Sequence, residues 1–148
     1  MASTPTRILT FAEFDKLPEP VSGRYELRHG ETVLVPPPKH AHYLMQRRLR
    51  RLLEAAAGAQ GEVEIEPGFR PQPDHEFWIA DVAFVSRERW DAIPSNGDLM
   101  GAPELVAEVL SPSNTMAELI EKKNDLPGKW SPRILGCRHT APARRSIA

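Results

Sequence analysis

The sequence is poor in the features that mark several common classes of protein. It has one cysteine, Cys137, among 148 residues, which excludes an internal disulfide framework and suits a reducing compartment. No apolar run approaches a membrane span, and the first residues lack the apolar region of a secretory signal. Lysine and arginine total 19 against 20 acidic residues, so no global field selects nucleic acid or membrane. We therefore expect a soluble cytoplasmic domain without a membrane partner.

Signatures of several enzyme classes are also missing. The sequence has no glycine-rich phosphate-binding loop and no Gly-x-Ser-x-Gly element. His40 and His42 lack the i, i+4 spacing of a helical zinc pair, and the cysteine lies far from them. Nucleotide-binding loops, serine hydrolases and zinc enzymes are therefore not indicated.

The periodicity predicts a mixed α/β domain with a β-sheet flanked by helices. A capping box from Thr10 to Glu13 opens a short helix, and a hairpin follows with its turn at His29-Gly30. A second capping box, Thr115 to Glu118, opens the last helix. Further elements are a helix over 42–57, strands over 61–66, 77–86 and 104–110, and one helical turn after residue 86. We expect a loose N-terminus over 1–9, one domain over 10–125, and an irregular tail over 126–148.

Two carboxylates interrupt otherwise apolar strands. Asp81 lies in "FWIADVAFVS" and Glu108 in "ELVAEVLSPSN". An ionised carboxylate in an apolar medium is very unfavourable, so it must be neutralised or partnered. If the two strands are adjacent and parallel, both acids can meet near one end of the sheet, where hard oxygen donors suit Mg²⁺. The alternative is structural, because an acid in a strand is often at an edge or paired with arginine or lysine.

Five segments resemble the Uma-type family of restriction-endonuclease-like proteins, in the PD-(D/E)XK nuclease superfamily. They are "LTFAEFDKLPEP", "GRYELRHGETVLVPPP", the helix opened by His42, "ADVAFVSRERW" and "GAPELVAEVLSPSNTMAELIEKK". They occur in the family's order over residues 8 to 125, and "PELVAEVLSPS" is the most specific. The resemblance implies a restriction-endonuclease-like core and a metal-dependent endodeoxyribonuclease that hydrolyses DNA phosphodiester bonds.

The resemblance also implies a set of site residues. Asp81 and Glu108 match the family's two strand acids, and Glu26 in "YEL" matches its early acid. These three would hold Mg²⁺, or Mn²⁺ in its place. Lys122 matches a catalytic lysine that the family carries on the helix after the last acid, with Lys123 as the alternative. From the residues alone, Glu26 could be a cross-strand partner in the hairpin, and Lys122 could pair with Glu118 one helical turn earlier.

The chain departs from the family at two places that bear on the site. Ala80 stands where the family has a proline before the central acid. After the lysine helix, "PGKWSPRILGCRHTAPARRSIA" replaces the family's last core strand, with Ile134-Leu135 as its only apolar pair. A missing strand would expose the neighbouring strand's edge. A catalytically inactive remnant, or a binding module on the same scaffold, is therefore the alternative function.

A basic surface on the helix over 42–57 is the candidate DNA interface, because a nuclease needs phosphate contacts. Its candidate residues are Lys39, His42, Arg47, Arg48 and Arg51, with Arg50 beside them. A solvated helix face or a protein-interaction surface has the same sequence pattern, and His42 could equally cap the helix or make a surface contact. Nucleases that cut both strands are often dimers, so a homodimer is a further alternative, although no self-complementary patch is visible.

Overall fold

The computed structural model describes residues 7–111, 116–124 and 133–138. Helices and strands alternate along the chain, as the periodicity predicts. The helices are α1 (Phe11–Phe14), α2 (His40–Ala57), α3 (Arg87–Asp91) and α4 (Met116–Asn124), with a 3₁₀ turn over Gly58–Gln60. The strands are β1 (Arg24–Arg28), β2 (Glu31–Val35), β3 (Gly61–Ile65), β4 (Gly68–Arg70), β5 (Trp78–Ile79), β6 (Val82–Ser86), β7 (Leu99–Met100), β8 (Leu105–Leu110) and β9 (Arg133–Arg138).

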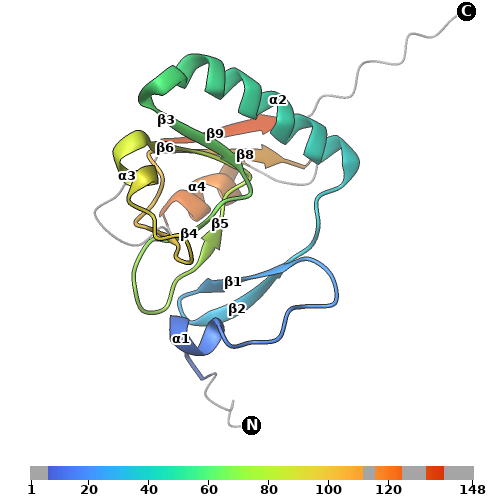
Figure 1. Cartoon of the computed structure of the whole chain (residues 1–148). Coiled ribbons are helices and arrows are strands. Elements are labelled where there is room, and N and C mark those ends of the chain that lie inside the picture. The colour runs from blue at the N-terminus through green and yellow to red at the C-terminus, as the bar shows by residue number, and fades with distance from the viewer. Residues whose placement is uncertain (1–6, 112–115, 125–132, 139–148) are drawn as a thin grey trace, which may run out of the picture.

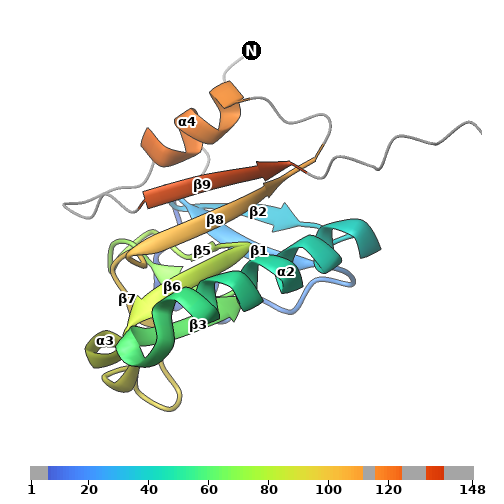
Figure 2. The same ribbon diagram turned by 90° about the horizontal axis from the view of Figure 1, so that it is seen from above.

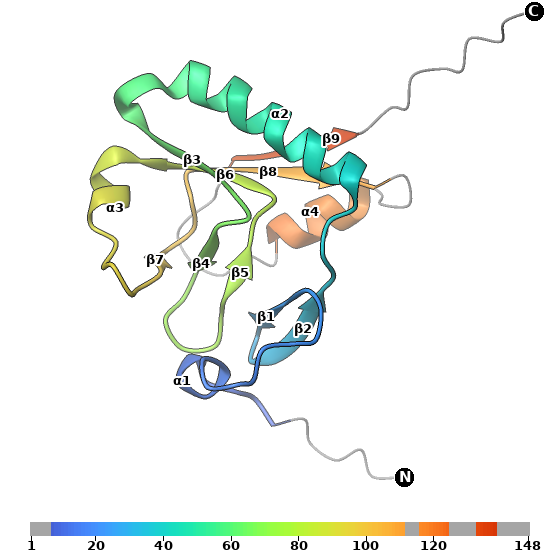
Figure 3. The same ribbon diagram turned by 45° about the vertical axis from the view of Figure 1, so that its right-hand side comes forward.

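A four-stranded sheet in the order β3-β6-β8-β9 forms the centre of the molecule. The strand pairs β3-β6 and β6-β8 are antiparallel, whereas β8-β9 is parallel. Helices α2 and α4 lie on opposite faces of this sheet (Figure 1 and Figure 3). The chain order α2, β3, β6, β8, α4, β9 therefore builds a mixed α/β sandwich, which is the predicted fold class.

The α2 face of the sheet is covered by an apolar cluster. Buried Val63, Val82 and Ala107 contribute from the three strands, and Leu49 and Leu53 contribute from α2. Burial of each large aliphatic side chain stabilises the fold by about 1.5–3 kcal/mol. Two apolar residues of α2 at helical spacing stay outside this cluster, since Ala56 is exposed and Leu52 is 63% exposed. The sheet contacts only a narrow stripe of the helix, so the flank of the apolar face stays in solvent.

The opposite face is covered by a small second sheet in the order β5-β4-β7. Phe69, Trp78 and Leu99 from this second sheet pack against Ala83 and Val106 of the central sheet in one cluster. Strand β7 was not predicted, because two residues in a long connection carry no periodic pattern.

The predicted hairpin and N-terminal helix are confirmed. Strands β1 and β2 pair antiparallel around His29-Gly30, where both residues have positive φ, 52° and 80°. Two such residues in succession match the right-handed twist of a two-residue hairpin. The Thr10–Glu13 capping box is also formed, with each side chain bonded to the other residue's backbone amide. The second capping box falls partly on Thr115, outside the described residues.

The expected strand over 77–86 is two strands, which is a correction to the sequence prediction. Strand β5 pairs with β4 in the second sheet, and β6 pairs with β3 in the central sheet. The chain crosses from one sheet to the other at Ala80-Asp81, and it makes the same crossing at Glu66-Pro67, between β3 and β4. The sequence is apolar on both sides of this crossing because β5 and most of β6 are buried, so it does not mark where one strand ends and the next begins.

The expectation of an irregular tail is wrong for Arg133–Arg138. These residues form β9 and pair with β8 along its whole length, from Leu105↔Arg133 to Leu110↔Arg138. Figure 2 shows β9 beside β8 at the edge of the sheet. The backbone bonds of the parallel ladder form regardless of side-chain type, and this edge of β8 is therefore covered.

No helix among the described residues is both long and apolar enough to cross a membrane.

Candidate active site

Asp81 lies at the corner where the chain passes from the second sheet into the central sheet. The register of β3 and β6 pairs Ile65 with Val82, so Glu66 stands opposite Asp81 one residue further on. The register of β6 and β8 pairs Val82 with Ala107, which places Glu108 opposite Asp81 on the other side. Glu66, Asp81 and Glu108 therefore lie side by side across the sheet, at the ends of or within the neighbouring strands β3, β6 and β8. The two strands of the predicted acids are adjacent, as expected, but antiparallel.

Both oxygens of the Asp81 carboxylate have partners. Oδ2 accepts a 2.7 Å hydrogen bond from the backbone amide of Val109. Oδ1 lies 3.1 Å from Nε2 of His42 and 3.5 Å from Nε2 of Gln46, both on α2. The side chains of Asp81 and His42 are 22% and 26% exposed. Asp81 is therefore held between β8 and α2 at a site that solvent still reaches.

Glu108 is buried, with 8% of its surface exposed. It lies within regular β8, where it alternates with Ala107, which packs towards α2. It therefore belongs with Val106 on the face opposite α2. A cation shared by Asp81 and Glu108 requires one of them to change rotamer, and Asp81 is the one outside a regular strand.

Glu26 is held by bonds to Arg28 in the hairpin and to the backbone of β5. It is 1% exposed, and its Oε1 accepts a 2.8 Å hydrogen bond from the amide of Ile79. Its Oε2 forms an ion pair with Arg28, at 2.7 Å from Nε. These contacts join β1 to β5, so the described bonds of Glu26 are those of a structural residue. Among the described residues, no three His, Cys, Asp or Glu side chains converge as metal ligands.

The lysine candidates lie on α4. Lys122 belongs to the helix, but its side chain is outside the described part of the structure, so neither its catalytic role nor its pairing with Glu118 is tested. Lys123 is exposed.

Two residues of the Asp81 corner escaped the sequence analysis. Gln46 is completely buried on α2, and its Nε2 lies 3.4 Å from Oε1 of Glu66. Glu66 follows β3 and has a positive φ of 53°, which a non-glycine residue rarely adopts. A glutamine four residues after His42, on the same helix face, was the available signal. The sequence gives no sign that Glu66 lies beside Asp81, because Glu66 resembles the exposed acids that alternate along the preceding strand.

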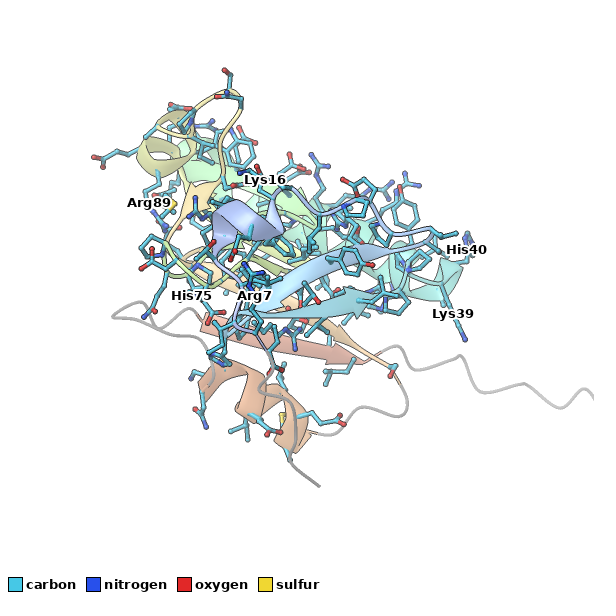
Figure 4. The ribbon with its side chains drawn as sticks, turned by 90° about the horizontal axis from the view of Figure 1, so that it is seen from below. Arg7, Lys16, Lys39, His40, His75 and Arg89 are labelled. Atoms are coloured by element: carbon cyan, nitrogen blue, oxygen red, sulfur yellow. The ribbon has the colours of Figure 1, made fainter. Side chains whose placement is uncertain are left out.

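The basic residues of α2 mostly face outward. Arg47, Arg48 and Arg51 are exposed and line a groove of about 360 Å³ with Leu44 and Met45. Arg50 differs, because it is bound to Glu54 and Glu64. Figure 4 shows Lys39 and His40 at one end of the molecule, where α2 begins.

Comparison with known proteins gives the family of this chain. The profile of the Uma2 family, described as "Putative restriction endonuclease", matches residues 11–125. The chain belongs to the Uma2 family. The match covers α1 through α4 and includes Asp81 and Glu108, whereas β9 lies beyond it. No curated protein matches this Uma2 chain.

A solved structure supports the fold of this Uma2 protein. It is a crystal structure from Anabaena variabilis ATCC 29413, described as a "putative nuclease belonging to DUF820". The two chains are 18% identical with a TM-score of 0.65, over 88% of this chain and 73% of that one. The Uma2 chain therefore has a restriction-endonuclease-like fold, and its family membership supports a nuclease function.

Proposed function

We propose that this protein is a metal-dependent endonuclease that hydrolyses phosphodiester bonds of DNA, with Asp81 at its centre. The observation that carries the proposal is the position of Asp81. Its carboxylate stands at a break between two sheets, bonded to His42 and to the amide that follows Glu108. It is partly open to solvent, although the strands on both sides of it are buried.

The donor set at this corner fits a hard divalent cation. Asp81 and Glu108 supply carboxylate oxygens, which are the ligands that Mg²⁺ and Mn²⁺ prefer. When bound, such an ion activates a water molecule and stabilises negative charge at a phosphate. Glu26 is less suited to this role than we expected, because its described bonds lie with Arg28 and the Ile79 amide.

The remaining residues have roles that follow from their positions. His42 orients the Asp81 carboxylate through the 3.1 Å contact. Lys122 on α4 is proposed to stabilise charge during cleavage. The exposed arginines Arg47, Arg48 and Arg51, together with Lys39, provide cations for the DNA backbone.

The inactive-remnant alternative was based on a missing last strand. Strand β9 occupies the edge of the central sheet beside β8. The scaffold around β8 therefore keeps its neighbours on both sides, and a missing strand no longer argues for inactivity.

The first prediction concerns Asp81→Asn. Asparagine keeps an oxygen that can accept the Val109 amide bond, so the fold should survive while the charge is lost. Loss of a residue that hydrogen-bonds to a metal ligand costs about 10–100-fold in affinity or activity, and loss of a ligand should cost at least that much. We expect cleavage of supercoiled plasmid in Mg²⁺ or Mn²⁺ to fall by about 100-fold or more, and wild-type cleavage to stop in EDTA.

The control for this experiment is Asp91→Asn, on α3, where the side chain is 62% exposed. That variant should cut at the wild-type rate. Equal cleavage by purified Asp81→Asn and wild-type protein would remove Asp81 from the reaction.

A further inference from the structure

The buried carboxamide of Gln46 is the least satisfied polar group near Asp81. Its Oε1 has no hydrogen-bond partner among the residues that the structure describes, although Gln46 is 0% exposed. Its Nε2 approaches Oε1 of Glu66 at 3.4 Å and Oδ1 of Asp81 at 3.5 Å. Both distances exceed the usual 2.7–3.2 Å range of a hydrogen bond. A buried amide whose oxygen has no partner and whose N–H bonds are long costs free energy, so its presence needs an explanation.

Glu66 is the carboxylate that shares this amide with Asp81. Its backbone amide donates a 3.0 Å hydrogen bond to the Asp81 carbonyl, which joins the two sides of the corner. Arg24 binds Oε2 of Glu66 at 2.6 Å, and Gln46 is the neighbour of Oε1. The side chain of Glu66 is 28% exposed, so the pair of acids is reachable from solvent.

The conformation of Glu66 gives independent support. Its φ of 53° is unfavourable for a residue with a side chain, and the proline that follows restricts it further. Such strain persists where the surrounding structure imposes it, and it is frequent at functional sites.

We propose that Glu66 and Gln46 complete a divalent-cation site with Asp81, on the α2 side of the sheet. This inference rests on the proposed function and names the residues of its metal site. Glu66 supplies a carboxylate in addition to those of Asp81 and Glu108, in place of the predicted Glu26. Gln46 supplies its Oε1, which a rotation of the amide turns towards the two acids. The oxygen and the NH₂ group of a carboxamide are similar in size, so the side chain can exchange their positions without movement of the backbone.

The chemistry favours a hydrated cation at this place. A cation removes the mutual repulsion of Glu66 and Asp81 and satisfies the orphan oxygen of Gln46. No three His, Cys, Asp or Glu ligands converge among the described residues, so water must fill several coordination positions. Mg²⁺ retains several of its waters when one or two carboxylates bind it.

The test measures binding of MnCl₂ or MgCl₂ alone, without DNA. Wild-type protein should gain several degrees in Tm at a hundredfold excess of the ion over its Kd. Titration calorimetry with Mn²⁺ should show a Kd at least about 10-fold weaker for Glu66→Gln and for Gln46→Met.

Two comparisons separate a metal site from a structural role. Glu64→Gln is the matched control, because Glu64 lies on β3 two residues before Glu66 and also pairs with an arginine, Arg50. It should bind Mn²⁺ like the wild type. Gln46→Met replaces an unsatisfied amide by an apolar group of similar size, so its Tm in EDTA should equal or exceed that of the wild type. A purely structural Gln46 would instead lower the Tm in EDTA and leave the ion-induced rise unchanged.

The outcomes also separate this inference from the proposed function. Unchanged Mn²⁺ binding by Glu66→Gln and Gln46→Met, with binding lost in Asp81→Asn, overturns the inference and leaves the nuclease proposal intact. Absence of Mn²⁺ and Mg²⁺ binding by the folded wild type, together with absence of cleavage, overturns both.

Discussion

At the scale of single residues, Asp81 shows how a small break in a strand creates a site. Had the strand over 77–86 been continuous, Asp81 would alternate with its neighbours and lie on one face only. The crossing between sheets instead frees its carboxylate to reach α2 and the Val109 amide. Glu108, inside an unbroken strand, has no such freedom.

The acid Asp98 gives a prediction of how the stability of the fold depends on pH. Asp98 lines a cavity of about 250 Å³ with Phe14, Tyr25 and Phe77, and burial raises its pKa above the ordinary value. Arg70 opposes this shift, whereas Asp15 adds to it. Because the folded-state pKa is raised, ionised Asp98 destabilises the fold above that pKa, and the penalty disappears below the unfolded-state pKa.

We therefore predict that Asp98→Asn raises the Tm at pH 7 and that this gain shrinks as the pH falls towards 3. Thermal unfolding of both proteins across this range measures it. Asp74→Asn, at an exposed loop position, should change the Tm little at either pH. A constant difference between Asp98→Asn and wild type at all pH values would assign the effect to packing.

At the scale of elements, α2 combines three surfaces. One side packs on the sheet through Leu49 and Leu53, and the first turns present His42 and Gln46 to Asp81. The outer side carries Arg47, Arg48 and Arg51, and Arg47 lies over the ring of Tyr43 at 5.9 Å. A duplex bound along the outer side would therefore lie on the helix that also holds the proposed active site.

The arginines of α2 can be tested together. If each contacts a phosphate, replacing all three with alanine should weaken DNA binding and reduce the slope of log K against log salt by about 3. Fluorescence anisotropy over a range of salt concentrations measures both quantities. Arg87→Ala is the control, because Arg87 is paired with Glu62 and Asp91 at the far end of the sheet. An unchanged slope in the triple variant would exclude this face as the DNA interface.

At the scale of the whole molecule, the two sheets share one core. Leu27 exchanges two 2.8 Å backbone bonds with Phe77, which ties the hairpin to the second sheet. The cluster around Trp78 then ties the second sheet to β6 and β8. Because the two sheets share this apolar cluster, we expect them to unfold together.

This expectation predicts a single thermal transition. Far-ultraviolet circular dichroism follows the helices, and fluorescence of a Trp130→Phe variant follows Trp78 and Trp90 in the shared core. The two curves should coincide in midpoint and width. An earlier fluorescence transition would show that the second sheet separates before the central sheet unfolds.

The sequence by itself determined the local elements and the candidate acids. Apolar periodicity, the Thr10–Glu13 capping box and the turn residues His29-Gly30 predicted α1, α2, α4, the hairpin and β8, because these depend on nearby residues. The interruption of two apolar strands selected Asp81 and Glu108, and family resemblance predicted the restriction-endonuclease-like fold. The pairing of strands that are distant in the sequence leaves no periodic pattern from which it could be predicted.

The tertiary structure alone decided what lies around Asp81. Local periodicity predicts neither the crossing between the two sheets nor the position of β9, because backbone pairing depends little on side-chain type. Glu26 and Glu66 look alike in sequence, yet one is bound within the hairpin and the other stands opposite Asp81. The partners of a carboxylate are set by which strands become neighbours, and that is fixed only when the whole core packs.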